Sequence, residues 1–278
     1  MATMSSIEVL SPAKLNLFLH VTGQRDDGYH TLQTVFQLLD WGDRLSFEVQ
    51  ASPGILLTTA LEDVPNDDNL IIKAARALDP EQQFGATIDL FKQIPMGGGL
   101  GGGSSNAAMT LLALNKLWKL DHDIDTLAKL GETLGADVPV FVRGYSCWAE
   151  GIGEEITPIA LPSRWFVILK PNCHVATAEI FRAPELTRNT APITVSAFFA
   201  GHVKNDLQAA VESRYPEVRH ALKWLRKHGS AMMTGSGACV FASYESQSEA
   251  ERIARLAPET VSAFVAKGIN KHPGMVHH

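Results

Sequence analysis

The stretch Pro95-Met96-Gly97-Gly98-Gly99-Leu100-Gly101-Gly102-Gly103-Ser104-Ser105-Asn106-Ala107-Ala108 is the most informative part of this sequence. Six of the seven residues from 97 to 103 are glycine, and glycine loses more backbone entropy on folding than any other residue. Such a run is explained if bare backbone amides must approach an anion at the start of a helix, where unpaired N–H groups and the helix dipole both favour negative charge. The stretch therefore predicts a phosphate-binding loop followed by a helix, and it makes nucleotide chemistry the first hypothesis.

Three kinds of glycine-rich structure compete for this stretch. A P-loop requires a lysine directly after its last glycine, and none follows here. The dinucleotide fingerprint G-x-G-x-x-G is matched by Gly97, Gly99 and Gly102, but the acidic residue expected about 20 residues later falls in a polar connection, at Asp121 or Asp123. A purely structural turn would not need six glycines. A dinucleotide-dependent oxidoreductase and a structural turn therefore stay open as weaker alternatives.

The chain as a whole has the composition of an ordinary soluble globular protein. Its 278 residues are 45% hydrophobic and 19% charged, a length that suits one large domain or, better, two. The formal net charge of −6 and the lack of a basic run argue against nucleic-acid binding. No apolar run reaches the roughly 18 residues of a membrane span, and the first residues lack the pattern of a signal peptide. We therefore expect a cytoplasmic protein that binds neither nucleic acid nor membrane.

The cysteines give no sign of a disulfide framework or a zinc site. Cys147, Cys173 and Cys239 are far apart in the sequence and form no C-x-x-C pair. A sparse, odd-numbered set of this kind fits a reducing compartment. Because each lies among apolar residues, we expect all three to be packed in the interior.

The pattern of apolar residues predicts an α+β protein without regular βαβ alternation. The expected strands are 7–22 (with a break at Ser11-Pro12), 31–39, 44–50, 55–59, 86–91, 165–169, the two arms of a glycine turn within 231–244, and 260–266. The expected helices are 69–78, 104–118, 124–134, 206–213, 216–228 and 246–256. The segment 136–139 is expected to be a tight junction and 183–196 to be irregular. The chain is best divided near 158–163.

Together with two further segments, the glycine-rich stretch resembles the phosphate loop of the galactokinase–homoserine kinase–mevalonate kinase–phosphomevalonate kinase (GHMP) superfamily. The further segments are Pro12-Ala13-Lys14-Leu15-Asn16-Leu17 and Thr234-Gly235-Ser236-Gly237-Ala238-Cys239, in the order that the superfamily has them. The resemblance implies an α+β fold of two domains. Residues 1–159 would form an N-terminal β/α domain like domain 2 of ribosomal protein S5, and residues 160–278 a ferredoxin-like C-terminal domain. The active site would lie in the cleft between them.

Segments between these motifs narrow the resemblance. Gly28-Tyr29-His30, Gly135-Ala136-Asp137-Val138-Pro139 and Thr177-x-x-x-Phe181 are similar to those of the GHMP kinases that act on a diphosphocytidyl-methylerythritol. This likeness implies ATP-dependent phosphorylation of the 2-hydroxyl of 4-diphosphocytidyl-2-C-methyl-D-erythritol, in the non-mevalonate route to isoprenoid precursors. A homoserine- or mevalonate-type kinase is the alternative within the superfamily. The aromatic side chains argue against it, because a small acceptor offers them nothing to clamp.

Lys14 and Asp137 are the expected catalytic residues. Asp137 precedes a proline in a tight junction, and its spacing alone fits a proton-accepting base and a capping residue equally well. The resemblance favours the base. Lys14 lies in an apolar strand, where a charge needs a partner or a task. It either forms a plain salt bridge, lies on a solvated strand face, or pairs with Asp137 and keeps that carboxylate ionised. Asn16 lies two residues along the same strand face and would hydrogen-bond beside it.

The resemblance also implies binding residues for ATP, Mg²⁺ and the acceptor. ATP would be held by the backbone of Pro95, Met96, Gly97, Gly98, Gly99, Leu100, Gly101, Gly102, Gly103, Ser104 and Ser105, with Asn69, Leu70 and Lys92 on the adenine side. Ser104 or Ser105 would lie near a Mg²⁺ ion. The acceptor would contact Asn16, Tyr29, His30, Thr177, Phe181, Gly235, Ser236 and Gly237. Without the resemblance, Tyr29 and His30 would be taken as a surface aromatic and a solvated histidine, and the Gly235–Gly237 turn as a strand connection. The expected partner is a small molecule, and the expected state is a monomer or a weak homodimer.

Overall fold

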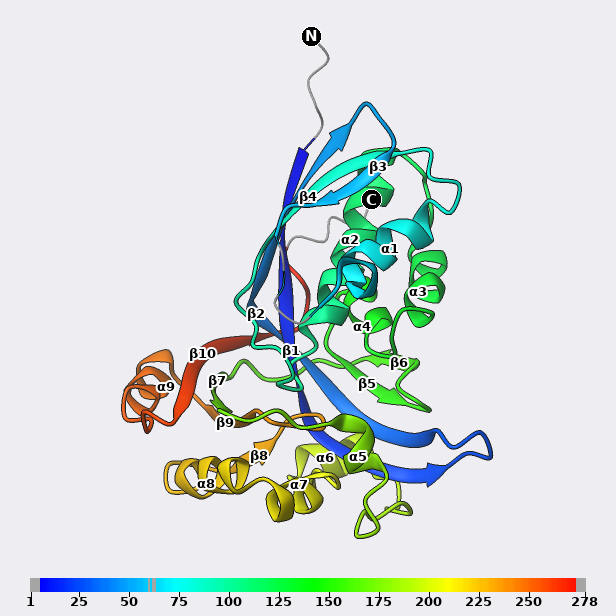
Figure 1. The fold of residues 1–278 in the computed structure, drawn as a ribbon. Coiled ribbons are helices and arrows are strands. Elements are labelled where there is room, and N and C mark those ends of the chain that lie inside the picture. The colour runs from blue at the N-terminus through cyan, green and yellow to red at the C-terminus, as the bar shows by residue number, and fades with distance from the viewer. Residues whose placement is uncertain (1–5, 60, 62–63, 274–278) are drawn as a thin grey trace.

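The computed structural model describes residues 6–59, 61 and 64–273 (Figure 1). The start of the segment in which no signal peptide is expected, residues 1–5, lies outside the described residues. The strands are β1 (Ser6–Gln24), β2 (His30–Gln50), β3 (Gly54–Leu57), β4 (Gly85–Phe91), β5 (Cys147–Glu150), β6 (Glu155–Pro158), β7 (Trp165–Pro171), β8 (Ala231–Met233), β9 (Val240–Tyr244) and β10 (Val261–Ile269). The helices are the 3₁₀-helix η1 (Asn66–Asp68) and the α-helices α1 (Leu70–Leu78), α2 (Gly102–Trp118), α3 (Ile124–Glu132), α4 (Val138–Arg143), α5 (Thr177–Phe181), α6 (Val195–Phe199), α7 (Gln208–Arg214), α8 (Pro216–Leu225) and α9 (Gln247–Ala254).

One mixed sheet connects the two halves of the molecule. Its strand order is β3-β4-β2-β10-β7-β9-β8, with β1 paired along β2 and with β5 pairing both β2 and β6. The last strand, β10, provides the connection, because it pairs with β7 over most of its length and with β2 at its end, at Gly268↔Leu39 and Ile269↔Leu38. The long hairpin of β1 and β2 passes from the upper half of the molecule into the lower half (Figure 1). This hairpin therefore carries residues to the junction of the two halves.

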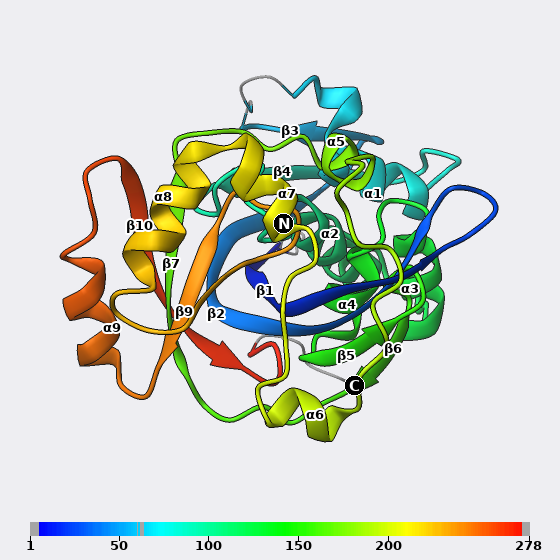
Figure 2. The ribbon, with the colours of Figure 1, turned by 90° about the horizontal axis from the view of Figure 1, so that it is seen from below.

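Helices cover the sheet in two separate groups. The first group, α1 to α4, lies together beside β1, β2 and β4, and it shares a core with them in which helix residues such as Leu111 and Phe141 pack on strand residues such as Phe47 (Figure 1). The second group, α7 to α9, packs on β7 to β10 around a second core, which includes Val167, Leu222 and Val240. Seen from below, β1 and β2 lie between these groups, with β10 and α9 at one edge and α3 and α4 toward the other (Figure 2).

Most of the expected elements form. The strands β5 and β6 and the helices α5 and α6 were not expected, and three expected features differ in detail. The expected break at Ser11-Pro12 is a register shift between Pro12 and Lys14 within one continuous strand, because the backbone bulges without leaving the sheet. The expected strands 31–39 and 44–50 are likewise joined in β2. The expected junction 136–139 contains the start of α4, whose Pro139 stands at the first helical turn, where a missing N–H is harmless. The expected boundary near 160 falls between β6 and β7, and the division into two domains stays a prediction.

Two of the three cysteines are packed in the interior, as expected. Cys147 and Cys239 are buried, and burial raises the pKa of each thiol to about 12. Cys173 is only partly buried, against the edge of the second core. None of the helices in the described part of the chain combines the length and apolar character that crossing a membrane requires.

Candidate active site

The glycine-rich stretch forms a loop that leads into α2. Gly97, Gly99 and Gly101 have positive φ values of 64°, 74° and 73°, a conformation that residues with a side chain rarely adopt. Gly101 is the N-cap residue of α2, and no side chain caps this end of the helix. The first backbone N–H groups of α2 are therefore presented to the surroundings, as an anion-binding loop requires.

The second glycine turn packs directly against this loop. The backbone N–H of Cys239 donates to the carbonyl oxygen of Gly98 at 3.2 Å. A Cβ atom placed on Gly99 would lie only 2.4 Å from the carbonyl oxygen of Thr234. The two backbones thus approach more closely than a side chain would permit, which explains why both segments are rich in glycine.

Two cavities meet at the loop. The first has a volume of about 490 Å³ and the second about 370 Å³. Both are lined by Gly97, Gly99, Gly101 and Ser104. The residues expected to bind ATP that line the second cavity are Asn69, Leu70, Lys92 and the loop from Pro95 to Ser104. The first cavity brings together residues from both halves of the chain, namely Lys14, Asn16, Asp137, Thr177, Phe181 and the turn Gly235–Gly237. A phosphate group held at the loop would therefore face both cavities.

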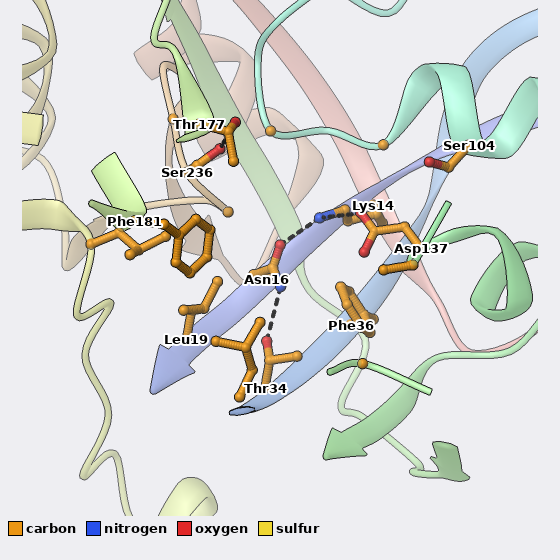
Figure 3. A pocket seen from close by; sticks show the side chains of 18 of the residues that line it. Lys14, Asn16, Leu19, Thr34, Phe36, Ser104, Asp137, Thr177, Phe181 and Ser236 are labelled. Atoms are coloured by element: carbon orange, nitrogen blue, oxygen red, sulfur yellow. Dashed lines mark hydrogen bonds and ion pairs between the residues drawn. The ribbon is translucent and has the colours of Figure 1, made fainter. Parts of the chain in front are cut away.

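The two expected catalytic residues form an ion pair in the first cavity. Lys14 Nζ lies 3.2 Å from Asp137 Oδ2, and Lys14 Nζ also donates to Asn16 Oδ1 at 2.5 Å (Figure 3). The ammonium group lies 5.0 Å from the ring centre of Phe36, and the backbone N–H of Lys14 donates to the carbonyl oxygen of Leu100 at 3.0 Å. The side chain of Lys14 is 5% exposed, so these partners replace the water that a buried charge gives up.

Asp137 stands at the N-cap position of α4 but does not cap that helix. Its backbone is helical rather than extended, and its side chain makes no cap hydrogen bond. The carboxylate instead turns toward Lys14, with 32% of the side chain exposed. Of the two roles that the spacing left open, the geometry disfavours the capping role and leaves the carboxylate accessible from the cavity.

The expected acceptor residues are only partly gathered around the first cavity. Thr177 and Ser236 line it, and their hydroxyl groups lie 2.6 Å apart (Figure 3). Phe181 lines the side opposite Asp137, and its ring centre lies 5.1 Å from that of His30. His30 therefore contacts Phe181, which lines the cavity, but does not line the cavity itself.

Tyr29 does not line either cavity. It lies in the turn between β1 and β2, and 65% of the residue is exposed. Its backbone N–H donates to Asp27 Oδ1 and its carbonyl oxygen accepts from the N–H of Arg25, so that the turn closes on itself. The structure therefore leaves Tyr29 in the surface position that its sequence context alone favours.

Arg188, which the sequence analysis did not single out, connects His30 to the segment that follows Phe181. Arg188 Nε donates to His30 Nε2 at 3.1 Å, and its two terminal nitrogens donate to the carbonyl oxygens of Phe181, Ala183 and Leu186. Because a guanidinium group can only donate, Nε2 of His30 must accept, and the neutral ring carries its proton on Nδ1. Burial lowers the pKa of His30, and the positive charge of Arg188 lowers it further.

On the nucleotide side, Asn69 and Lys92 have different surroundings. Asn69 is 5% exposed, and its Oδ1 caps α1 by accepting from the N–H of Ile71 at 3.0 Å. Its Nδ2 is buried and has no hydrogen-bond partner among the described residues, although the residue itself lines this cavity. Lys92 Nζ is occupied: it donates to Asp43 Oδ2 at 2.8 Å and to the carbonyl oxygen of Ile94. Burial lowers the pKa of Lys92, an effect that the Asp43 carboxylate opposes.

The two candidate magnesium ligands point in different directions. Ser104 lines both cavities, whereas Ser105 is fully buried and its hydroxyl accepts from Ser11 at 2.8 Å. Only Ser104 is therefore placed to meet an ion between the cavities. Within the described part of the chain, no cluster of three or more His, Cys, Asp or Glu side chains could hold a metal by itself.

Four residues at or beside the site had no recognisable signal in the sequence. Asp43 is completely buried and accepts hydrogen bonds from the backbone ahead of the loop. Thr34 bonds to Asn16, Arg188 bonds to His30, and His174 lies beside Gly97, where a Cβ would be 2.7 Å from its Nδ1. Each acts on a residue distant in sequence, so no local spacing could have revealed it.

Comparison with known proteins agrees with this geometry. The model of the family described as "GHMP kinases N terminal domain" matches residues 69–145. The model of the family described as "GHMP kinases C terminal" matches residues 193–262. The 4-diphosphocytidyl-2-C-methyl-D-erythritol kinase of Pseudomonas entomophila is 53% identical over 269 residues, which are 96% of this chain and 94% of the relative. A crystal structure of 4-(cytidine 5'-diphospho)-2C-methyl-D-erythritol kinase superposes with a TM-score of 0.83 at 34% identity, covering 94% of this chain and 99% of the other.

A more distant likeness concerns the fold alone. Homoserine kinase from Cytophaga hutchinsonii superposes with a TM-score of 0.71 at 18% identity, over 99% of this chain and 98% of the other. The expected α+β fold of this superfamily is therefore confirmed. The chain belongs to the GHMP kinase family and, within it, to the 4-diphosphocytidyl-2-C-methyl-D-erythritol kinases.

Proposed function

We propose that this chain, by its family an ATP-dependent small-molecule kinase, phosphorylates the 2-hydroxyl of 4-diphosphocytidyl-2-C-methyl-D-erythritol in the non-mevalonate route to isoprenoid precursors. The products are the 2-phosphate and ADP. The observation that carries the proposal is the ion pair of Lys14 and Asp137, 3.2 Å apart, in a cavity that borders the glycine-rich loop. A hydroxyl group in this cavity could meet a phosphate group in the adjoining one.

Asp137 is the proposed general base. Phosphoryl transfer depends mainly on positioning and on stabilisation of charge, with a carboxylate accepting the proton of the attacking hydroxyl. Asp137 fits this task because it does not cap α4 and remains partly exposed. The Lys14 ammonium group would hold the carboxylate in place and stabilise negative charge that develops between the acceptor oxygen and the transferred group.

The second cavity is the proposed ATP site. The backbone amides from Gly97 to Ser104 and the start of α2 would hold the phosphates. Asn69 and Leu70, which line this cavity, would lie beside the adenine base. Lys92 would act indirectly, because Asp43 and the carbonyl of Ile94 already hold its ammonium group next to the loop.

Mg²⁺ is the proposed companion of ATP. This ion keeps several water ligands and binds phosphate oxygens, so it requires few ligands from the protein. Ser104, which lines both cavities, fits that limited role, and the buried Ser105 does not. When bound, the ion neutralises charge on the phosphates being separated.

The cytidyl end of the acceptor would lie between Phe181 and the start of β2. Phe181 offers an aromatic face, His30 offers an N–H donor, and Thr177 and Ser236 offer hydroxyl groups toward the polar middle of the substrate. Gly235 and Gly237 would allow close approach of the substrate to the turn. Tyr29 could join only by movement of its exposed turn, since it lines neither cavity.

We also infer the setting in which the enzyme works. We expect a monomer or a weak homodimer that acts without a membrane, and the formal net charge of −6 argues against binding to nucleic acid. The three free cysteines support a reducing compartment, the cytoplasm.

The test is a substrate panel. The purified protein is incubated with ATP, Mg²⁺ and one acceptor at a time, namely the diphosphocytidyl substrate, homoserine or mevalonate, and ADP release is followed. We expect turnover only with the diphosphocytidyl substrate, with the new phosphate ester detected by ³¹P NMR. Turnover with homoserine or mevalonate instead would overturn the proposed substrate, and the absence of turnover with any acceptor would overturn the proposed reaction.

A further inference from the structure

A short chain of hydrogen bonds links the backbone of β1 to the catalytic ion pair through Thr34 of β2. The hydroxyl of Thr34 donates to the carbonyl oxygen of Phe18 at 2.5 Å and accepts from Nδ2 of Asn16 at 3.0 Å. Asn16 Oδ1 then accepts from Lys14 Nζ, which pairs with Asp137 (Figure 3). Thr34, Asn16 and Lys14 are 1%, 3% and 4% exposed.

The direction of every bond in this chain is fixed by its two ends. A carbonyl oxygen can only accept, so the Thr34 hydroxyl must give its single proton to Phe18. It can then only accept from Asn16, which must present its NH₂ group to Thr34. An ammonium group can only donate, so Asn16 must present its oxygen to Lys14. Both ends therefore demand the same orientation of the Asn16 amide.

The β1–β2 register places Thr34 where it can do this. The pairing shifts between Asn16 and Leu19, so the carbonyl group of Phe18 lies at a bulge rather than in a regular ladder. The hydroxyl of Thr34 satisfies that carbonyl. This hydrogen bond therefore stabilises the bulge and also fixes the rotamer of Thr34.

We propose that Thr34 is a positioning residue for phosphoryl transfer: it holds the Asn16 amide in the one orientation that gives Lys14 an acceptor, and so aims the Lys14 ammonium group at Asp137. This inference rests on the proposed function. Without the hydroxyl, the Asn16 amide loses its anchor and can turn its NH₂ group toward Lys14, where two donors repel each other. Lys14 then leaves the position between Asn16 and Asp137.

The experiment compares two pairs of proteins, and the members of each pair differ chiefly in the hydroxyl group of residue 34. The first pair is the wild type and Thr34→Val, and the second is Thr34→Ser and Thr34→Ala. Thr34→Val is nearly isosteric with the native residue, whereas Thr34→Ser and Thr34→Ala both lack the methyl group and differ from each other only in the hydroxyl. We expect Thr34→Val and Thr34→Ala to lower kcat about 10- to 100-fold, the range that corresponds to one lost buried hydrogen bond. Thr34→Ser should stay within about threefold of the wild type. KM for ATP should be unchanged, because Thr34 lines only the first cavity.

Three outcomes would decide against the inference. Equal losses in Thr34→Ser and Thr34→Ala would mean that the methyl group matters rather than the hydroxyl. Near-normal kcat in Thr34→Val would mean that Asn16 needs no anchor, and a raised KM for the acceptor at unchanged kcat would mean that Thr34 contacts substrate directly. If Thr34→Val fails to fold, the Ser and Ala pair gives the answer. Inactivity of the wild type itself would instead contradict the proposed function.

Discussion

At the scale of single residues, the ion pair of Lys14 and Asp137 uses an aspartate that does not cap the helix at whose start it stands. Asp137 occupies the N-cap position of α4, yet its backbone is helical and its carboxylate faces Lys14. An N-cap side chain normally satisfies a backbone N–H of the first turn. The helix gives up that bond, and the carboxylate stays free for the cavity.

Asp137→Asn tests the role of this carboxylate. The amide cannot accept a proton, so we expect kcat to fall by about 10²- to 10⁴-fold, while the affinity for ATP measured by calorimetry changes less than about threefold. Asp125→Asn is the matched control, because it is an exposed acid that pairs with Arg143 away from the site. Retention of near-normal kcat in Asp137→Asn would contradict the assignment of the base.

Arg188→Gln tests the support of the acceptor side. The change removes the donor to His30 and the bonds to the turn after Phe181, so both rings should lose their fixed positions. Steady-state kinetics should show KM for the diphosphocytidyl substrate raised about tenfold with KM for ATP unchanged. Arg164→Gln, which affects only a surface pair with Glu245, serves as the control. Equal changes in both KM values would indicate general loosening of the fold.

At the scale of elements, the glycine-rich loop and the second turn form one unit. Gly99 combines a positive φ of 74° with contact against the backbone of Thr234, so a side chain there is excluded twice. The loop is therefore restricted in its conformation, because the backbone of the second turn packs directly against it.

Gly99→Ala should therefore destabilise the protein more than an ordinary left-handed glycine would. We expect the free energy of unfolding, measured with urea, to fall by about 3 kcal/mol, with loss of ATP binding. Gly201→Ala is the control, since Gly201 has φ of 83° with open space around its Cα and should cost about 1 kcal/mol. Equal losses would show that the contact with Thr234 is irrelevant.

The elements also show where sequence patterns succeed. The expected helices 69–78 and 104–118 form as α1 and α2. α1 has an apolar face and a side-chain cap at Asn69, whereas α2 is buried along most of its length and begins at Gly102 without a side-chain cap. The short helices α4 and α5 were not expected: six and five residues are too few to display a periodic face. Their formation depends on packing against the rest of the molecule. α5 contains the expected site residues Thr177 and Phe181, and the expected site residue Asp137 directly precedes α4.

At the scale of the whole molecule, the junction between the halves contains a buried histidine. His20 on β1 is 3% exposed, and neither ring nitrogen has a hydrogen-bond partner among the described residues. Burial lowers its pKa from the ordinary value of 6.5, opposed by Asp206 and assisted by Lys204. The folded protein therefore favours the neutral form of His20 in its interior, beside the ring of Phe18.

This burial predicts a loss of stability in acid. The unfolded chain takes up a proton on His20 near pH 6.5, whereas the folded chain does so only at lower pH, so stability that is present above pH 6.5 decreases as the pH falls below it. His20→Phe, which keeps a ring beside Phe18, should reduce this decrease. Urea unfolding at pH 7 and pH 5 provides the measurement. If the variant loses as much stability as the wild type, His20 is not responsible.

The sequence predicts the α+β class and the family, and it points to Lys14, Asp137 and the glycine-rich loop as candidate site residues, because glycine density, apolar periodicity and ordered motifs can be read from the chain alone. It also left Tyr29 and Ser105 as site residues, and it gave no sign of Thr34 or Arg188. The tertiary structure was needed to show which of two adjacent serines lines the cavities, and which side chains hydrogen-bond to Asn16 and His30. The physical reason is that burial and hydrogen-bond direction arise between residues distant in sequence, when β1, β2 and the turn after α5 come together.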